Sequence, residues 1–325
     1  MYFENIVCVM GSNGQIGIPL SLHLASLSIL GSASVITADK RDPVEALQSF
    51  PFIQCDATNF DSFSEILSSY HVSVLYNLPC ILSATGEKDP LAAWGLNMAV
   101  ILNGLELAKA SHLQLFWPSS IAVCGAVTPK NPMFQHVSLD PSSMYGVCKV
   151  AGESLGNYYF HKFGVDVRSV RYPGLLSSET DPGGGTTDYA VDIFYKALQT
   201  GSYTCYLRED TLLPMMYMPD AINAATLLMN APFDQVKIRT SYNLGAFSFT
   251  PRQLGEAIAR YVPGFTCHYE VDPLRQAIAD SWPGFIDDRE ARDDFGWQPQ
   301  WTFEAMVYDM LTKVRERLNR YCTVA

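Results

Sequence analysis

Two adjacent stretches near the start of the sequence decide its fold, NIVCVM at residues 5–10 and GSNGQIG at residues 11–17. The first is a short β-branched, apolar run, which predicts a buried parallel strand. The second leads into an apolar helical pattern over residues 18–30. Glycines between a strand and a helix allow a tight turn, close packing of both elements, and approach of a pyrophosphate to the amides at the helix N-terminus. Alone, this pattern is equally compatible with a simple tight turn.

The segments that follow alternate between strand and helix patterns. Further strands are expected at residues 34–38, 52–55, 72–78, 113–117 and 165–172, and long helices at residues 91–110 and 141–162. Such alternation predicts an α/β fold with a doubly wound parallel sheet of the Rossmann type. In this context the glycine stretch is a dinucleotide site, with contacts expected from Gly11, Asn13, Gly14, Gln15, Ile16 and Gly17.

The chain of 325 residues is long enough for one large domain or two closely associated ones. We expect residues 1–173 to form the dinucleotide-binding domain, with a returning segment near residues 213–247. Residues 174–212 and 248–325 would then form a smaller α/β region that binds the substrate. After residue 174, the sequence predicts strands at residues 203–207 and 241–244 and helices at residues 189–199 and 251–261.

Acidic residues end the expected second and third strands. Asp39 ends the second, where a carboxylate accepts hydrogen bonds from the adenosine ribose hydroxyls and repels a 2′-phosphate. This favours NAD over NADP, although Lys40 and Arg41 follow at once. Asp56 ends the third strand, where it either lies near the adenine or caps the helix that begins near Asn59.

Tyr145 and Lys149 are four residues apart, so they lie on one face of the expected helix. A nearby ammonium favours the phenolate and lowers the pKa of a tyrosine, which can then take a proton from an alcohol or return one to a ketone. Upstream, Ser119 and Ser120 follow an apolar strand and offer a hydroxyl to hold the same oxygen. Such a pair also occurs by chance on surface helices. The dinucleotide site expected upstream favours a catalytic role for this pair.

Composition narrows the classes of function. The content of 48% apolar and 17% charged residues describes a globular protein, and the net charge of −11 argues against a nucleic-acid partner. No apolar run approaches the ~20 residues of a membrane span, and the first residues lack the pattern of a signal peptide. The eight cysteines are scattered without a CxxC pair. This favours reduced thiols in an intracellular protein over a disulfide framework or a zinc site.

A glycine-rich stretch, DPGGGTTD at residues 181–188, precedes the helix expected at residues 189–199. Such a loop can close on a substrate, and its hydroxyls and carboxylate suit a small polar molecule. The same residues equally suit a helix N-terminus, with Thr187 or Asp188 in the first turn. Trp282 lies in an aromatic, turn-rich stretch and is either a core residue or a wall of the substrate pocket.

These features, in this order, resemble the extended short-chain dehydrogenase/reductase superfamily. Longer stretches are similar to the short-chain type of L-threonine 3-dehydrogenase, and the similarity runs from Ile6 to about Leu311. They are ILSATGEKDP at residues 81–90, RYPG at 171–174, PGGGTTDYA at 182–190, LPMMYMPD at 213–220 and WPGFIDD at 282–288. The third and fourth stretches are long enough that chance explains them poorly.

The resemblance implies NAD-dependent oxidation of the L-threonine 3-hydroxyl to 2-amino-3-oxobutyrate, without a metal. Carried onto this chain, Tyr145 is the base, and Lys149 supports its charge and binds the nicotinamide ribose. Ser120 orients the substrate hydroxyl, with Ser119 as its alternative partner. Further contacts are implied to NAD from Leu78 and Tyr172, and to the substrate from Ser83, Gly185, Thr186, Thr187 and Trp282. NLPC at residues 77–80 departs from the family, which more often has a histidine and paired alanines there.

Two other classes of function compete with this interpretation. The first is a nucleotide-sugar epimerase or dehydratase of the same superfamily, which shares the serine, tyrosine and lysine. A 4,6-dehydratase also needs an acid pair beside the active-site hydroxyl, where this chain has Ile121 and Ala122. A nucleotide-sugar pocket would also use more basic residues late in the chain. The second is a non-catalytic NAD-binding regulator, but such proteins usually lose the tyrosine–lysine pair that this chain keeps.

The resemblance also implies a homodimer formed through the helices at residues 91–110 and 141–162. The product would pass to a 2-amino-3-ketobutyrate CoA ligase, which makes glycine, or decarboxylate to aminoacetone. We expect no nucleic-acid or membrane partner. The expected location is intracellular, either cytoplasmic or in the mitochondrial matrix, with no targeting segment visible in the sequence.

Overall fold

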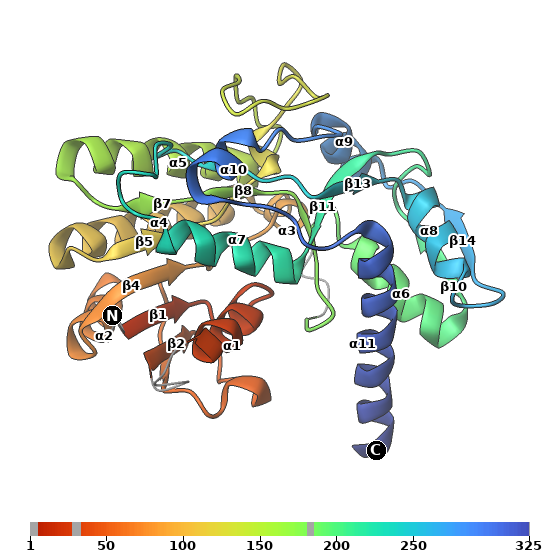
Figure 1. The fold of residues 1–325 in the computed structure, drawn as a ribbon, viewed down its shortest axis with the longest axis horizontal. Coiled ribbons are helices and arrows are strands. Elements are labelled where there is room, and N and C mark those ends of the chain that lie inside the picture. Colours follow the sequence, from red (N-terminus) through yellow and green to blue (C-terminus); the bar gives the residue numbers. More distant parts are fainter. Residues whose placement is uncertain (1–5, 28–33, 181–184, 325) are drawn as a thin grey trace.

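The computed structural model describes residues 6–27, 34–180 and 185–324, the side chains of residues 321–324 excepted. Its main element is a six-stranded parallel sheet with the strand order β3-β2-β1-β4-β5-β7 (Figure 1). The strands are β1 (Ile6–Met10), β2 (Val35–Asp39), β3 (Phe52–Gln54), β4 (Val72–Asn77), β5 (Gln114–Phe116) and β7 (Val167–Arg168). The chain reverses direction across the sheet between β1 and β4, so the predicted doubly wound fold is confirmed. Residue 5 of the expected first strand and residues 28–30 of the expected first helix lie outside the described residues.

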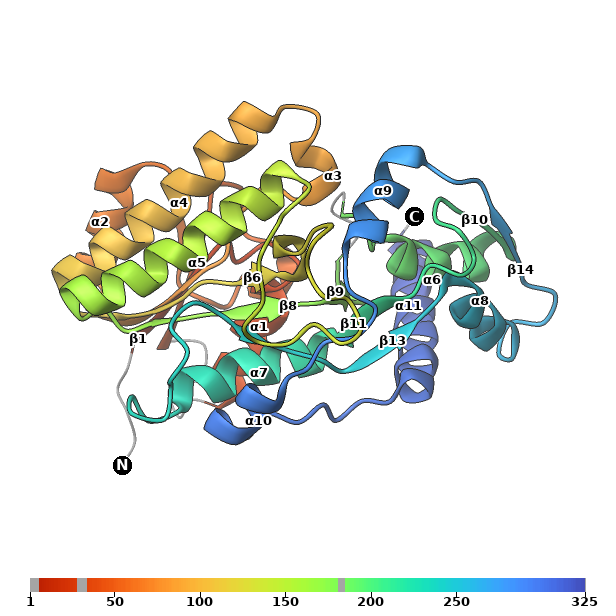
Figure 2. The ribbon, with the colours of Figure 1, turned by 90° about the horizontal axis from the view of Figure 1, so that it is seen from above.

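Helices cover both faces of this sheet. α2 (Phe60–Ser69), α4 (Pro90–Ser111) and α5 (Met144–Phe163) pack on one face and share a hydrophobic core with the strands. α1 (Gly17–Leu27) and α7 (Met218–Asn230) pack together on the other face, around a second core (Figure 2). The late segment that contains α7 therefore returns to cover the first half of the chain.

Successive residues of the strands face alternate cores. In β1, Cys8 and Met10 belong to the core under α4 and α5, whereas Val9 belongs to the core under α1 and α7. In β4, Leu75 belongs to the core under α4 and α5, and Tyr76 belongs to the core under α1 and α7. Because both faces are covered, β1 is apolar at every position, which explains the uninterrupted run at residues 6–10.

The helix α4 corrects one inference from the sequence. By length and composition it is long and apolar enough to cross a membrane. The expectation that no apolar run in the sequence approaches this length is therefore wrong. Half of its apolar window is buried inside the molecule, against α5 and the sheet. Its apolar character is therefore that of a core helix.

The strand expected at residues 165–172 is broken into two. β7 ends at Arg168, and β8 (Val170–Tyr172) leaves the main sheet to pair in parallel with β6 (Ser119–Ser120) and β12 (Tyr242–Asn243). The strand pattern continues through the break because β8 is also buried. The sequence therefore does not reveal the change of sheet.

A third core lies under the remaining elements, which gather beside the main sheet (Figure 1). Its strands are β9 (Gly174–Leu176), β11 (Leu213–Tyr217) and β13 (Phe247–Phe249) in one sheet, and β10 (Ser202–Cys205) and β14 (Thr266–Tyr269) in another. The helices not yet named are α3 (Ser83–Gly86), α6 (Tyr189–Thr200), α8 (Pro251–Ala259), α9 (Pro273–Ser281), α10 (Arg289–Phe295) and α11 (Phe303–Val324), with short 3₁₀ turns η2 (Glu45–Leu47) and η3 (Ile121–Val123).

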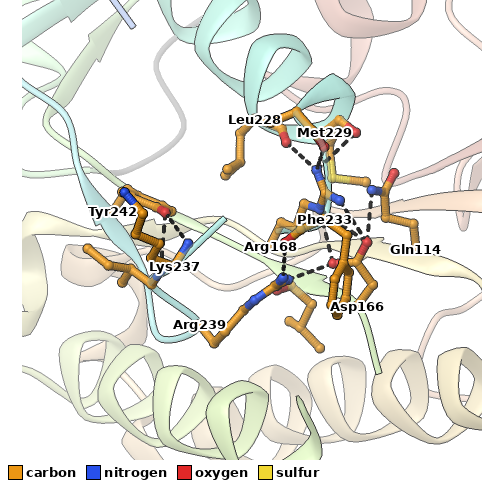
Figure 3. Close-up of polar contacts among 12 residues, drawn as sticks. Gln114, Asp166, Arg168, Leu228, Met229, Phe233, Lys237, Arg239 and Tyr242 are labelled. Atoms are coloured by element: carbon orange, nitrogen blue, oxygen red, sulfur yellow. Dashed lines mark hydrogen bonds and ion pairs between the residues drawn. The ribbon is translucent and has the colours of Figure 1, made fainter. Parts of the chain in front are cut away.

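A half-buried carboxylate, Asp166, ties the edge of the sheet to the end of α7 (Figure 3). Arg168 donates to it from Nε at 3.0 Å and from Nη2 at 2.8 Å, and Arg239 donates from Nη1 at 2.6 Å. The Nη1 atom of Arg168 also donates to the carbonyl oxygens of Leu228, at 2.6 Å, and Ala231, at 2.7 Å, which end α7. Burial alone would raise the pKa of Asp166, but the two guanidinium groups outweigh it and lower the pKa.

We predict that Asp166→Asn lowers the free energy of unfolding by about 3 kcal/mol, because two buried guanidinium groups lose their counter-charge. Urea denaturation at neutral pH measures this change. Glu209→Gln, which breaks an exposed pair with Arg252, is the matched control and should have a smaller effect. Since the folded pKa is depressed, the contribution of Asp166 is present above about pH 4 and is lost as the pH falls through the folded value. Equal effects of the two variants would contradict this role.

Candidate functional site

An open cleft of about 740 Å³ lies where the strand order of the main sheet reverses. Its walls come from the loops that follow β1, β4 and β5, from α5, and from the segments after β8. Ligands of doubly wound sheets bind at this kind of crevice, outside the carboxyl ends of the strands.

The cleft brings together most of the site residues that the sequence predicts. These are Gln15, Ile16, Leu78, Ser83, Ser120, Tyr145, Lys149, Tyr172, Gly185, Thr186, Thr187 and Trp282. Six others do not line it, namely Gly11, Asn13, Gly14, Gly17, Asp39 and Asp56. Lining residues that the sequence did not assign are Cys80, Leu82, Ile121, Pro173, Gly174 and Leu175. Except for Cys80, these are apolar or glycine, so only their adjacency to assigned residues signalled them.

The glycine loop has the geometry that a pyrophosphate requires. Gly11 has a φ of +81°, which a residue with a side chain rarely adopts. A Cβ atom on Gly17 would lie 2.3 Å from the carbonyl oxygen of Gly11, so only glycine fits at the start of α1. The helix therefore begins directly behind the loop, and its first amides are available to an anionic group.

Asp39 is buried at the end of β2 and joins the glycine loop to Arg41. Its Oδ2 accepts from the backbone N–H of Asn13 at 3.2 Å, and its Oδ1 accepts from the N–H and Nε of Arg41 at 3.0 and 3.1 Å. The carboxylate thus lies where a ribose diol is held in doubly wound folds. The Arg41 side chain is 62% exposed, which places a cation at the same position.

Asp56 does not cap α2, contrary to one of its two interpretations. The N-cap of α2 is Asn59, whose side chain accepts from the N–H of Ser62 at 3.1 Å. Asp56 instead accepts from the N–H and hydroxyl of Thr58, at 2.9 and 2.8 Å, and these bonds lower its pKa. Its carboxylate orders the turn before the helix.

Ser120, Tyr145 and Lys149 meet at the centre of the cleft. α5 begins after Ser143, whose side chain caps it by accepting from Gly146, so Tyr145 lies in the first turn. The Tyr145 hydroxyl is hydrogen-bonded to the Ser120 side chain. One turn later, the buried Nζ of Lys149 donates to the carbonyl oxygen of Pro118 at 2.6 Å.

Burial affects the two ionisable groups in opposite directions. It raises the pKa of the Tyr145 phenol, and the hydrogen bond from Ser120 only partly offsets this. Burial likewise lowers the pKa of the Lys149 ammonium. The lowering of the tyrosine pKa that the sequence predicted is therefore outweighed by desolvation. The phenolate needs further positive charge in the cleft.

Ser119 faces away from the reacting groups. Its hydroxyl donates to Oε1 of Glu153 at 2.6 Å, and the residue is 2% exposed. Of the two adjacent serines, Ser120 is therefore the one whose hydroxyl is bonded to Tyr145. Glu153 had not been singled out from the sequence, although it continues the four-residue spacing of Tyr145 and Lys149.

The opposite wall of the cleft carries hydroxyl groups. Ser83 and Thr186 are both buried, and their side-chain oxygens lie 3.2 Å apart. Asp188 occupies the N-cap position of α6, but its carboxylate accepts from the N–H of Gly185 at 2.8 Å and does not cap the helix. Residues 181–184 of the expected glycine-rich loop lie outside the described residues.

Trp282 satisfies both of its interpretations. It is 7% exposed and belongs to the third core, and it also lines the cleft. It is the C-cap residue of α9 and directly follows the last residue of that helix. Within the described part of the chain, no group of three or more His, Cys, Asp or Glu side chains is arranged to hold a metal ion.

Comparisons with known proteins agree with this geometry. The model of the NAD dependent epimerase/dehydratase family matches residues 7–245. An uncharacterized epimerase/dehydratase of Staphylococcus haemolyticus is 46% identical over 316 residues, which cover 97% of this chain and 98% of that protein.

Two solved structures are similar along nearly the whole chain. L-threonine dehydrogenase from Clostridium difficile is 42% identical with a TM-score of 0.93, covering 96% of this chain and 98% of that one. The GalE-like L-threonine dehydrogenase from Cupriavidus necator, in its holo form, is 48% identical with a TM-score of 0.91, covering 95% and 99%. The cofactor of the matched family is NAD, and the glycine loop and Asp39 fit it.

We predict that Asp39→Ala weakens NADH binding about tenfold, because hydrogen bonds from the ribose to a charged acceptor are lost. Binding of NADPH should improve relative to NADH, since the repelling charge is removed and Arg41 is released. Fluorescence titration with each cofactor measures both changes. Asp42→Ala, which removes an exposed carboxylate three residues later, is the control and should leave both affinities unchanged. Unchanged selectivity in Asp39→Ala would mean that the ribose lies elsewhere.

Proposed function

This chain belongs to the NAD dependent epimerase/dehydratase family, and we propose that within it the protein acts as an L-threonine 3-dehydrogenase. The reaction oxidises the 3-hydroxyl of L-threonine to a ketone, giving 2-amino-3-oxobutyrate. One observation carries the proposal: Ser120, Tyr145 and Lys149 share a cleft with a second cluster of hydroxyls, in a chain 42–48% identical to the two L-threonine dehydrogenases.

In the proposed reaction, the Tyr145 phenolate removes the proton of the substrate hydroxyl. Ser120, which is hydrogen-bonded to Tyr145, donates to the same substrate oxygen and orients it. NAD⁺, when bound, supplies a cationic ring that accepts the hydride from the carbinol carbon. Lys149 binds the nicotinamide ribose and favours the phenolate from within the cleft.

The amino-acid end of the substrate is assigned to the opposite wall. Ser83 and Thr186 offer hydroxyls, already within hydrogen-bond distance of each other, to the carboxylate of an amino acid. Gly185 and Thr187 complete this wall. The ring of Trp282 provides an apolar surface for the methyl group of threonine, which serine lacks.

We also propose the domain division expected from the sequence. Residues 1–173 and 213–247 would bind the cofactor, and residues 174–212 and 248–325 would bind the substrate. The hydrophobic cores support this division in outline, with two against the main sheet and one beneath the later elements. They also cross its boundaries, because α10 packs on a main-sheet core and β11 contributes to the third core.

A homodimer through α4 and α5 remains our proposal for the assembly. Large apolar side chains on the outer surface of these helices are exposed, namely Leu91, Trp94, Leu102, Val147 and Tyr158. The same surface of a second chain would cover them. Two parallel helices from each chain would then form the interface.

The product is expected to pass to a 2-amino-3-ketobutyrate CoA ligase or to lose its carboxylate and form aminoacetone. An intracellular location is consistent with this use of NAD and with the free thiols of the seven cysteines whose side chains the structure describes. The curated relative is staphylococcal, and it lends no support to the mitochondrial option.

The alternative is a nucleotide-sugar epimerase or dehydratase. The relative from Staphylococcus haemolyticus carries the name epimerase/dehydratase. Against a 4,6-dehydratase, the residues beside Ser120 are Ile121 and Ala122, and both are buried apolar side chains. An acid pair cannot act from these positions.

We predict that purified protein with NAD⁺ and L-threonine produces NADH, followed by its absorbance. NADP⁺, D-threonine and L-serine, each replacing its counterpart, should give slower rates, and a chelator should change nothing. An enzyme that binds NADH but oxidises no amino acid would contradict the proposal and favour the nucleotide-sugar or regulator class.

We predict that Tyr145→Phe reduces kcat about a thousandfold, because the general base is lost. Its affinity for NADH should stay near that of the wild type, since the ring is retained. In the wild type, kcat should rise with pH, because burial raises the pKa of the Tyr145 phenol. Tyr308→Phe, which alters an exposed tyrosine on α11, is the control. Full activity in Tyr145→Phe would remove this residue from the mechanism.

A further inference from the structure

Glu153 is a buried carboxylate beside the cleft for which the reaction has no direct use. It lies on α5, four residues after Lys149 and eight after Tyr145, and it is 2% exposed. It does not line the substrate cleft; with Arg171 and Gln135 it lines a separate hollow. A group in this position can act on the reaction only through its neighbours.

The carboxylate is held rigidly by Arg171. The guanidinium donates from Nε to Oε1 at 2.9 Å and from Nη2 to Oε2 at 2.7 Å. Arg171 is itself fixed, because its Nη1 donates to the carbonyl oxygen of Gln135 and to Oδ1 of Asn243. All three nitrogens of the Arg171 guanidinium are therefore hydrogen-bonded, and its planar, bidentate pair with Glu153 fixes the orientation of the carboxylate.

From this fixed position, Glu153 reaches the strand that carries Ser120. Its Oε1 accepts the hydroxyl of Ser119 at 2.6 Å. In the pairing of β6 with β8, Ser119 lies opposite Arg171, and Ser120 lies opposite Tyr172. The carboxylate therefore joins the two strands one residue before Ser120 and Tyr172, which both line the cleft.

Glu153 also lies one helical turn after Lys149, on the same face of α5. Burial lowers the pKa of the Lys149 ammonium, and the carboxylate of Glu153 is among the groups that oppose this, after Cys80 and Cys148. The Nζ atom of Lys149 lies 4.3 Å from the ring centre of Trp117 and 5.4 Å from that of Tyr145. Among the groups that oppose the effect of burial, Glu153 is the carboxylate.

We propose that Glu153 is a positioning residue of the active site, which fixes Ser120 through Ser119 and keeps Lys149 charged. The carboxylate serves both groups from one place because Arg171 allows it no other. An ion pair that served stability alone would need neither the bond to Ser119 nor its place on the Tyr145–Lys149 face of α5. The inference rests on the proposed function for its first half, which is measured as turnover.

The first test is Ser119→Ala, which leaves the buried ion pair intact. We expect kcat with L-threonine to fall about tenfold, because a small displacement of a reacting group is costly. KM for NAD⁺ and for L-threonine should stay within about twofold, since Ser119 binds neither. Ser154→Ala, an exposed neighbour on α5, is the control. Wild-type kcat in Ser119→Ala would overturn the role of Glu153 toward Ser120.

The second test is Glu153→Gln, read out without substrate or cofactor. In protein labelled with ¹³C,¹⁵N-lysine, NMR follows the titration of the Lys149 side chain, assigned with Lys149→Arg. We expect its midpoint to move to lower pH by about one unit in Glu153→Gln, because an opposite charge is lost. It should not move in Ser119→Ala. An unmoved midpoint in Glu153→Gln would overturn the role toward Lys149.

The two proposals fail in distinguishable ways. Absence of any L-threonine turnover in the wild type would refute the proposed function, and the lysine titration would still decide the charge role of Glu153. Circular dichroism and thermal unfolding identify a Glu153→Gln variant that does not fold because Arg171 has lost its partner. Ser119→Ala then decides the role of Glu153 toward Ser120.

Discussion

The site depends on how closely α5 approaches the segment that follows β5. A Cβ atom on Gly146 would lie 2.1 Å from the carbonyl oxygen of Ala122, and one on Gly152 would lie 2.2 Å from the Trp117 ring. Side chains at these two positions would push the helix away from the sheet edge. Because glycine is present at both, the tyrosine and lysine on the same stretch of helix reach the serine hydroxyl and backbone carbonyl that they bond.

Close packing also creates an electrostatic problem that the rest of the site answers. Burial disfavours the charged forms of both Tyr145 and Lys149, yet the chemistry needs both of them charged. The ammonium of Lys149 and the phenolate of Tyr145 favour each other's charged form. The carboxylate of Glu153 favours the ammonium, and a bound cationic cofactor ring would favour the phenolate. In the protein alone, burial therefore favours the neutral form of the tyrosine.

Sequence reasoning succeeded where a local pattern has one structural solution. The glycine loop, the apolar strand of residues 6–10 and the four-residue spacing on α5 each constrain the backbone directly, and the fold follows from them. It failed where the outcome depends on which strands pair or on the direction in which a side chain points. The strand pattern of residues 165–172 does not reveal that the chain changes sheet at Ser169. Likewise, two adjacent serines look equivalent in the sequence, and the structure shows that the hydroxyl of Ser119 donates to Glu153 whereas Ser120 lies beside Tyr145.

The division of the cleft into two walls explains how one catalytic set serves a family of different reactions. The groups that we propose to handle the proton lie on β6 and α5, close to the main sheet. The groups assigned to the substrate lie on α3 and in the segment before α6, joined across the cleft by the hydroxyls of Ser83 and Thr186. Changing the second wall alters what is bound without disturbing the first. Substrate identity is therefore a property of loops from both halves of the chain, and reaction chemistry is a property of the helix–sheet contact.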